Sequence, residues 1–354
     1  NTKALYKLNQ SVLDTSKSLY DLNKEIYWYL RYGIKVKAET WENNQTVWLI
    51  DWKEIDKNDF AIAEEVTTKW IHNTKRPDIV IYVNGIALWV IELKRSKVWI
   101  TQWIRQNLDN QKEEFIKNFF STIQLVMAWN DTQWLKYGCI ETPEKYYLSW
   151  KEESDIDNLL DKGISQMCSK ERLLELVHDF TVFDKGTKKL CRQNQYFGVK
   201  AAEQSLWNRE WGIIWHTQWS GKSLTMVWLT KWILENINDS RILIITDREE
   251  LDDQIEKVFM WVDENIYRTT SGRDLISKLN TKEEKLICSL VHKFWSKKQS
   301  DVDWYLDEMK KSIPKDFEAK WDIYVFVDEC HRTQSGTLHD AMKLILPNAI
   351  FVWF

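Results

Sequence analysis

The sequence predicts an α/β protein of two domains, a mixed α/β domain followed by a domain built on a parallel sheet. Its 354 residues favour two domains as a starting estimate. Two apolar runs flank Asn84-Gly85, which is the strongest short-range signal for a β-hairpin. From about residue 186, apolar runs alternate with helical patterns, and that alternation is typical of a parallel sheet covered by helices.

The N-terminal domain is expected to span residues 1–150. Apolar residues recur at roughly helical spacing in residues 1–30, which predicts helix there. The charged stretch 151–185 is expected to form a helical connection to the second domain. The other elements expected in this half are a strand near 47–51, the hairpin over 78–94, and a helix followed by a strand over 104–128.

The C-terminal domain is expected to span residues 186–354. Helical patterns separate its apolar runs, so each strand would reach the next by a crossover helix, as parallel strands require. The expected strands are Gly212–His216, Arg241–Thr246, Lys285–Leu290, Ile323–Asp328 and Ala349–Phe354.

Composition excludes several classes of protein. The net charge of −4 means that any contact with DNA must come from local basic patches. The five cysteines are scattered without a CxxC pair, which argues against a zinc site and fits the reducing cytoplasm. No apolar run approaches the ~20 residues of a membrane span, so no membrane contact is expected. The chain begins at Asn1 instead of Met, so a fragment of a longer protein is expected.

Tryptophan is unusually frequent and glycine unusually rare. The chain has 22 tryptophans and 10 glycines, whereas glycine averages roughly 7% of residues in proteins. Some tryptophans occupy turn-like or glycine-rich contexts, such as Trp129 before Asn130-Asp131 and Trp219 in a predicted phosphate loop. We hypothesise that many of them are glycines encoded by UGA and written as tryptophan. The alternative is a protein that is truly rich in tryptophan.

The strongest chemical signal is the run His216–Ser223, which follows an apolar strand and opens a helix. Its end, Gly221-Lys222-Ser223, matches the close of a Walker A loop in the required strand–loop–helix context. Backbone amides at the helix N-terminus would hold phosphate oxygens of ATP. Lys222 would reach the β- and γ-phosphates, and Ser223 would hold Mg²⁺. Thr217 and Ser220 are expected to complete the nucleotide site.

An acidic pair is expected to complete the ATP site. Asp328-Glu329 follows the apolar run Tyr324–Val327, about a hundred residues after the phosphate loop. Asp328 would bind Mg²⁺, mostly through water, and Glu329 would activate the attacking water. Either motif alone also fits a capped helix or a solvated strand end. Their order and context together predict nucleotide hydrolysis.

The hairpin carries a second set of candidate metal ligands. Asp78 begins its first strand, while Glu92 and Lys94 end the second and share one face because they are two residues apart. Two carboxylates can hold Mg²⁺, and a lysine beside the metal can orient water for attack on a phosphodiester. Both ends are expected to be exposed. Charged ends of surface strands give the same pattern often, so the signal alone is weak.

The register of the hairpin tests this metal site. With a strict two-residue loop at Asn84-Gly85, Asp78 would lie opposite Ile91 and Glu92 would point to the other face. A shared metal needs one extra residue, in a longer loop or a β-bulge. The sequence therefore predicts an irregularity between residues 83 and 90.

Taken together, these motifs resemble the restriction (motor) subunit of type I restriction–modification enzymes over most of the chain. The most specific of them are the Asp-Arg and Asp-Glu-Cys-His-Arg blocks. The residues that carry the resemblance include Arg76-Pro77-Asp78, Val83-Asn84-Gly85, Ile91-Glu92-Leu93-Lys94, Tyr196-Phe197, Thr246-Asp247-Arg248 and Asp328-Glu329-Cys330-His331-Arg332. Where the family usually has glycine, this chain has tryptophan at positions 103, 129, 134, 211, 219 and 353.

The resemblance implies a PD-(D/E)xK nuclease-like domain followed by a RecA-like superfamily 2 ATPase lobe. It implies that Asp78, Glu92 and Lys94 are nuclease residues, Gln106 a supporting glutamine, and Gln195 the glutamine that reads adenine. It implies a motor that uses ATP to translocate double-stranded DNA and cuts it with Mg²⁺, in company with methylation and specificity subunits. The chain stops before the family's next helicase motif, so the second ATPase lobe is expected to be absent from it.

Two other functions fit the same motifs. The first is a helicase-like remodelling ATPase whose N-terminal domain binds DNA or protein without cutting. A metal-dependent nicking assay separates it from the restriction subunit. The second is a non-enzymatic relic inactivated by its tryptophans, because an indole at Trp219 would block a loop that must wrap phosphate closely. The codon at position 219 decides that alternative.

Overall fold

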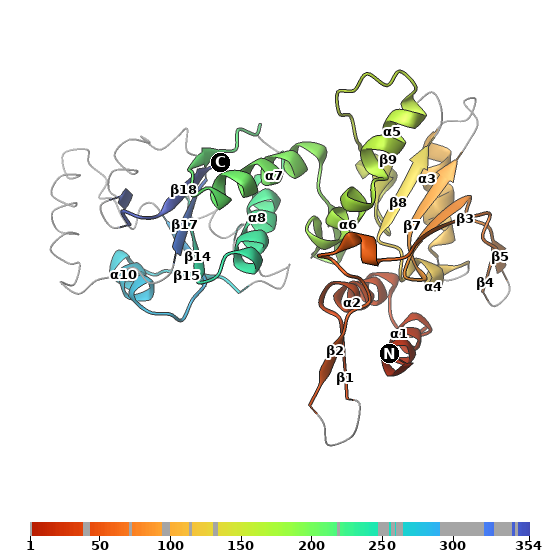
Figure 1. Ribbon diagram of the computed structural model, residues 1–354, viewed down its shortest axis with the longest axis horizontal. Coiled ribbons are helices and arrows are strands. Elements are labelled where there is room, and N and C mark those ends of the chain that lie inside the picture. Colours follow the sequence, from red (N-terminus) through yellow and green to blue (C-terminus); the bar gives the residue numbers. More distant parts are fainter. Residues whose placement is uncertain are drawn as a thin grey trace. The chain divides into compact units, whose positions relative to one another are not determined.

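The computed structural model divides the chain into two compact units, residues 1–193 and 194–354, and each is described by itself (Figure 1). The structure describes residues 2–37, 43–70, 73–93, 100–112, 115–129, 134–217, 220–246, 255, 259, 265–290, 322–328, 342–343 and 346–354. None of the helices in these ranges combines the length and apolar composition of a membrane-spanning helix.

The N-terminal unit begins with two helices, α1 (Thr2–Val12) and α2 (Leu19–Tyr32), where the sequence predicts helix. The chain turns between them, and the Ser18 side chain caps α2 by accepting a hydrogen bond from the amide of Asp21. The buried residues of α2 recur every three or four positions, so one stripe of this helix packs into the core.

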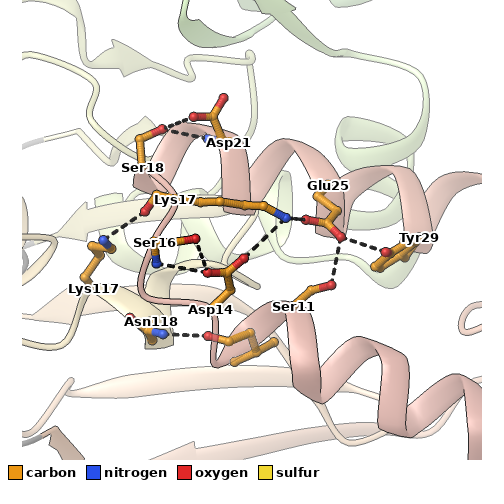
Figure 2. Close-up of polar contacts among 11 residues, drawn as sticks. Ser11, Asp14, Ser16, Lys17, Ser18, Asp21, Glu25, Tyr29, Lys117 and Asn118 are labelled. Atoms are coloured by element: carbon orange, nitrogen blue, oxygen red, sulfur yellow. Dashed lines mark hydrogen bonds and ion pairs between the residues drawn. The ribbon is translucent and has the colours of Figure 1, made fainter.

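Polar contacts tie this helical hairpin together (Figure 2). The carboxylate of Glu25 accepts hydrogen bonds from the side chains of Ser11 at 2.8 Å, Lys17 at 2.6 Å and Tyr29 at 2.7 Å. Burial alone would raise the pKa of Glu25, but these hydrogen bonds outweigh it and hold that pKa below its usual value. Lys117 in turn donates to the backbone oxygen of Lys17 at 3.0 Å, which joins the hairpin to α4 (Lys117–Phe120).

A six-stranded mixed sheet forms the core of the N-terminal unit. Only β7 and β8 run parallel, and the other neighbours are antiparallel. Side by side, the strands are β10 (Leu148–Ser149), β9 (Lys136–Gly138), β8 (Leu125–Trp129), β7 (Ile86–Leu93), β6 (Ile79–Val83) and β3 (Phe60–Glu64).

Helix α3 (Ile100–Asn110) follows β7 and packs against β8, so the predicted order of helix and then strand is confirmed. Val80, Val90 and Val126 of three adjacent strands pack with Phe120 beside them, and all four side chains are fully buried.

The smaller elements are β1 (Ile34–Val36) paired with β2 (Gln45–Val47), β4 (Thr68–Trp70) paired with β5 (Asn73–Lys75), and the 3-10 turns η1 (Ile55–Lys57) and η2 (Glu144–Tyr146). The strand expected near residues 47–51 corresponds to β2, which lies earlier in the chain and ends at Val47.

Residues 151–193 belong to the N-terminal unit, so the division lies at 193/194 instead of the expected 185/186. The expected helices are present as α5 (Leu159–Met167) and α6 (Lys170–His178), but they lead into a hairpin of β11 (Thr181–Asp184) and β12 (Thr187–Leu190). The hydroxyl of Tyr137 in β9 donates to the Cys191 carbonyl at 2.9 Å. The segment is therefore packed into the first unit and is not a linker between two domains.

The C-terminal unit contains the predicted parallel sheet. Its strands lie in the order β13 (Gly212–Ile213), β18 (Ile350–Trp353), β17 (Asp322–Val327), β14 (Ser240–Thr246), β16 (Leu286–Leu290) and β15 (Tyr267–Arg268). Four of the five expected strands are confirmed at nearly their predicted bounds, β13 is shorter, and β15 is additional. The helices described here are α7 (Gln193–Trp207), α8 (Lys222–Asn236) and α10 (Gly272–Asn280).

Candidate functional site

The β6–β7 hairpin has a tight turn and a bulge. Asn84 and Gly85 form the turn with φ of 50° and 78°, values that favour Asn and Gly. Near the turn, Tyr82 pairs with Ala87, but one step further Ile81 pairs with Trp89. Leu88 is therefore an extra residue in β7, and the predicted irregularity between residues 83 and 90 is confirmed.

The bulge brings the two candidate carboxylates to the same face of the sheet. Beyond it, Ile79 lies opposite Ile91, so the next pair outward is Asp78 opposite Glu92. One carboxylate oxygen of Asp78 accepts a hydrogen bond of 2.7 Å from the Leu93 amide, which holds Asp78 against the end of β7. Two carboxylates on one face of a sheet can act together as oxygen ligands of a hard cation.

Glu92 lies deeper than the sequence suggested. Its side chain was expected at an exposed strand end, yet it is only 2% exposed, because β7 is a central strand flanked by β6 and β8. Burial of a carboxylate is unfavourable unless hydrogen bonds, an ion pair or a metal offset the lost hydration. The two carboxylates thus fit a hard cation such as Mg²⁺ in donor type and placement. Lys94 lies outside the described residues.

Gln106 is on the solvent-exposed side of α3. The buried side of the helix carries Trp103, Ile104 and Asn107 instead. The helix faces the sheet through that buried side, so the exposed position of Gln106 does not favour direct support of the buried Glu92. A shift of one residue turns a helical side chain by about 100°, which sequence matching alone cannot resolve.

Tyr147 is a neighbour of the site that the sequence did not single out. It is 7% exposed and packs with Trp103, Ile104 and Ala128, and Ala128 is the register partner of Glu92 in the next strand. Burial raises the pKa of the Tyr147 phenol, and the nearby Cys139 and Glu92 charges raise it further. Nothing in its sequence context marks this tyrosine, because it enters the site from a different part of the chain.

The phosphate loop has the predicted strand–loop–helix context. Gly221 caps the N-terminus of α8 with φ 89° and ψ 37°, and Lys222 and Ser223 form the first turn, where both are half-buried. A Cβ atom at Gly221 would lie 2.4 Å from the Nε2 atom of Gln195. The positive φ therefore favours glycine at this position, and any larger residue would also have to displace the Gln195 side-chain amide.

Gln195 is tied directly to this loop. It is 2% exposed in α7, and its Nε2 donates to the carbonyl of Gly221 at 3.0 Å. Ser220 is also buried, and its hydroxyl has no hydrogen-bond partner among the described residues, whereas Thr217 is exposed. Trp219 lies outside the described residues.

Asp328 lies at the same edge of the parallel sheet as the phosphate loop. It directly follows β17, is 6% exposed, and its amide donates to the Ile245 carbonyl of β14 at 3.0 Å. The carboxyl ends of parallel strands meet at one edge, and ligands of open α/β sheets bind there. The structure thus places Asp328 and the Lys222–Ser223 turn on the ligand-binding edge. Glu329 lies outside the described residues.

The tryptophans at family glycine positions adopt ordinary backbone angles wherever the structure describes them. Trp103 lies within α3, Trp129 within β8 and Trp353 within β18, and all three are buried. Among the described residues, no tryptophan has a positive φ. Left-handed backbone geometry therefore does not argue for glycine at these positions, and recoding stays a prediction that the gene must test.

Two family models match the chain, one in each unit. The N-terminal domain of the type I restriction enzyme R protein matches residues 1–145, and the SWI2/SNF2 ATPase matches residues 194–354. The ATPase match implies that the second unit uses ATP. The two matches lie on either side of the division between the structural units.

Curated relatives match nearly the whole chain at low identity. The type I restriction enzyme MjaIXP endonuclease subunit of Methanocaldococcus jannaschii is 26% identical, covering 98% of this chain and 36% of its own length. The HindI endonuclease subunit of Haemophilus influenzae is 26% identical, and the match covers 94% of this chain and 34% of that subunit. The chain thus spans about a third of the length of these relatives. Taken together, the R-protein match in the first unit, the ATPase match in the second and these endonuclease subunits show that the chain is similar to the R subunits of type I restriction enzymes.

Proposed function

We propose that this chain forms the nuclease and the first motor lobe of an ATP-dependent type I restriction endonuclease that translocates double-stranded DNA. The observation that carries the proposal is the bulge at Leu88, which places Asp78 and Glu92 opposite each other on one face. A regular hairpin would have separated these carboxylates. The bulge is therefore the feature that makes a shared metal site possible.

In the proposed nuclease site, Asp78 and Glu92 hold Mg²⁺ through carboxylate oxygens. Mg²⁺ supplies positive charge that stabilises the developing negative charge on the phosphodiester. The Leu93 amide donates to one oxygen of Asp78 and so orients this carboxylate, whose other oxygen would be available to a metal ion. Lys94, two residues after Glu92 in the sequence, would orient the attacking water.

In the proposed motor site, the first turn of α8 binds the phosphates of ATP. Lys222 approaches the β- and γ-phosphates, and Ser223 with Asp328 holds Mg²⁺ at the edge of the sheet. Gln195 fixes the loop through the Gly221 carbonyl, and Glu329 activates the attacking water. DNA is the partner of both units, and methylation and specificity subunits select the site, as the similarity to type I restriction enzymes suggests.

A nicking assay tests the nuclease assignment. Supercoiled plasmid is incubated with the full chain and increasing Mg²⁺, and Glu92→Gln serves as the variant because it keeps the shape of the buried side chain. We expect Mg²⁺-dependent nicking by the unsubstituted chain and at least a hundredfold loss in the variant. A chain that binds DNA but never nicks it would favour the remodelling ATPase instead.

A further inference from the structure

A lysine is buried in the core of the N-terminal unit, far from the carboxylates in sequence. Lys188 in β12 is 2% exposed. Lysine is rarely buried unless hydrogen bonds satisfy its amine. Its place in the core therefore needs an explanation.

The Lys188 amine satisfies two buried amide oxygens. It donates to Oδ1 of Asn23 at 2.8 Å and to Oε1 of Gln124 at 2.5 Å. Its remaining surroundings include the rings of Phe183 and Tyr27, whose centroids lie 5.4 Å and 6.0 Å from Nζ. Burial lowers the pKa of Lys188 to about 7, and the nearby Cys139 opposes that shift. A neutral amine still has two N–H donors for these two oxygens.

Both partners of Lys188 hold the turn that leads into β8. The side-chain nitrogen Nδ2 of Asn23 donates to three backbone carbonyls of that turn, at distances of 2.7–3.1 Å. These carbonyls belong to Phe120, Ser121 and Ile123. The side-chain nitrogen of Gln124 donates to the Thr122 carbonyl at 2.9 Å. The side chains of Asn23 and Gln124 thus fix the turn through their nitrogens, while their oxygens accept hydrogen bonds from Lys188.

The same turn contacts the bulge. The backbone amide of Gln124 donates to the carbonyl of Leu88 at 2.7 Å, and Leu88 is the extra residue that changes the hairpin register. One residue further along, Leu125 pairs with Trp89 in the parallel β7–β8 ladder. A short path of hydrogen bonds therefore runs from the Lys188 amine through Gln124 to the bulge.

We infer that Lys188 is a positioning residue of the candidate nuclease site, which holds the bulge at Leu88 and so keeps Asp78 opposite Glu92. The inference rests on the proposed function for its catalytic consequence. Its structural part, support of the bulge through Gln124, is independent of catalysis. Lys188 itself touches neither carboxylate in this arrangement and acts through the turn before β8.

The test compares Lys188→Met with Lys189→Met in the full chain. Methionine keeps the length of the side chain but removes its donors. Lys189 is the matched control because it is next in sequence, yet its side chain is 40% exposed and its amine pairs with the buried carboxylate of Asp184 instead of with Asn23 and Gln124. Two readouts are taken: hydrogen exchange of the Gln124 and Trp89 amides, and the Mg²⁺ concentration for half-maximal nicking.

In Lys188→Met we expect faster exchange at both amides and a roughly 10- to 100-fold higher Mg²⁺ requirement, the range typical for loss of residues that orient metal ligands. Lys189→Met should match the unsubstituted chain in both. A purely structural role would lower the melting temperature without changing the Mg²⁺ requirement of the folded protein. Unchanged exchange at Gln124 and an unchanged Mg²⁺ requirement in folded Lys188→Met would overturn the inference.

A second variant keeps the test decisive. If circular dichroism shows that Lys188→Met is unfolded, Gln124→Met replaces it, because this change cuts the path to the bulge and leaves the Lys188–Asn23 hydrogen bond in place. The expected and overturning results are the same. If the unsubstituted chain and Lys189→Met never nick DNA, the proposed function fails, while amide exchange still decides whether Lys188 holds the bulge.

Discussion

Asp78 accepts a hydrogen bond of 2.7 Å from the backbone amide of Leu93, the residue directly after Glu92. This contact holds the Asp78 carboxylate beside the end of β7, where Glu92 lies. It also gives Asp78 a fixed orientation before any metal binds. The relationship exists only because β7 contains one residue more than a regular hairpin would need.

Removing the charge of Glu92 is expected to abolish Mg²⁺-dependent cleavage without unfolding the chain. The neutral amide in Glu92→Gln is a weaker ligand than a carboxylate, while its volume suits a side chain that is 2% exposed. Nicking rates and circular dichroism of this variant are compared with those of Lys94→Ala, which should lose cleavage through loss of the charge near the water. Persistent cleavage in either protein would place the nuclease centre elsewhere.

Substitution at Gly221 is expected to impair nucleotide binding. Gly221→Ala introduces a Cβ atom 2.4 Å from Nε2 of Gln195, at a φ of 89° that alanine rarely adopts. Strain of this kind is worth about 1–3 kcal/mol, so ATP affinity should fall by roughly tenfold or more if the loop shifts. Gly212→Ala is the control, because nothing lies within 4 Å of a Cβ atom there. Equal ATP affinity in the two variants, measured by calorimetry, would contradict the assignment.

The codon at position 219 is expected to be UGA, as are those at 103, 129, 134, 211 and 353. A tryptophan before Ser220 should block close wrapping of the phosphates, whereas glycine should permit it. Sequencing the gene gives the codons, and ATP affinity of the chain with tryptophan or glycine at position 219 tests the consequence. UGG at this position, or equal ATP affinity in both proteins, argues for a natural tryptophan.

Residues 1–354 with glycine at position 219 are expected to bind ATP but hydrolyse it very slowly. An arginine finger contributes roughly 10³–10⁵ in rate in enzymes that use one, and in helicase-like motors it comes from a second lobe. Binding should depend on Lys222, so Lys222→Ala should abolish it. Turnover is measured with and without DNA. Rapid DNA-stimulated hydrolysis by these residues alone would show that the catalytic site is complete within them.

The stability of the chain is expected to gain from Lys188 as pH rises above about 7. Burial lowers the folded-state pKa of Lys188 to about 7, whereas a lysine in the unfolded chain has a pKa of about 10.4. Above pH 7 the unfolded state binds the additional proton, so unfolding takes up a proton and becomes less favourable as pH increases. The contribution cannot exceed about 1.4 kcal/mol per pH unit.

Denaturant unfolding between pH 7 and 8.5 measures this contribution. Burial raises the pKa of Cys139 and Cys191, but both cysteines are present in the unsubstituted chain and in Lys188→Met, so the comparison between the two proteins isolates Lys188. The free energy of unfolding of the unsubstituted chain should increase with pH relative to that of Lys188→Met. Parallel curves for the two proteins would mean that Lys188 is protonated in the folded state throughout.

The sequence alone determined the local features. A parallel sheet followed from the alternation of apolar runs and helical patterns, and the strand and helix on either side of Gly221 followed from the Walker A pattern. It also determined that the hairpin needed an irregularity, because the side-chain period of a strand is two and Asp78 and Glu92 otherwise face opposite ways. Each of these features depends on neighbours close in the chain.

Only the tertiary structure decided what depends on distant contacts. It placed the extra residue at Leu88, where the amide of Gln124 meets the bulged carbonyl. It buried Glu92 by putting β8 beside β7, and it turned Gln106 outward. It assigned β12 to the first unit through Lys188, whose partner Asn23 is 165 residues away in the chain. Such contacts follow from the packing of the folded chain and not from the spacing of residues in the sequence. The neighbours of a residue in the sequence do not indicate which distant side chain will form its hydrogen bonds.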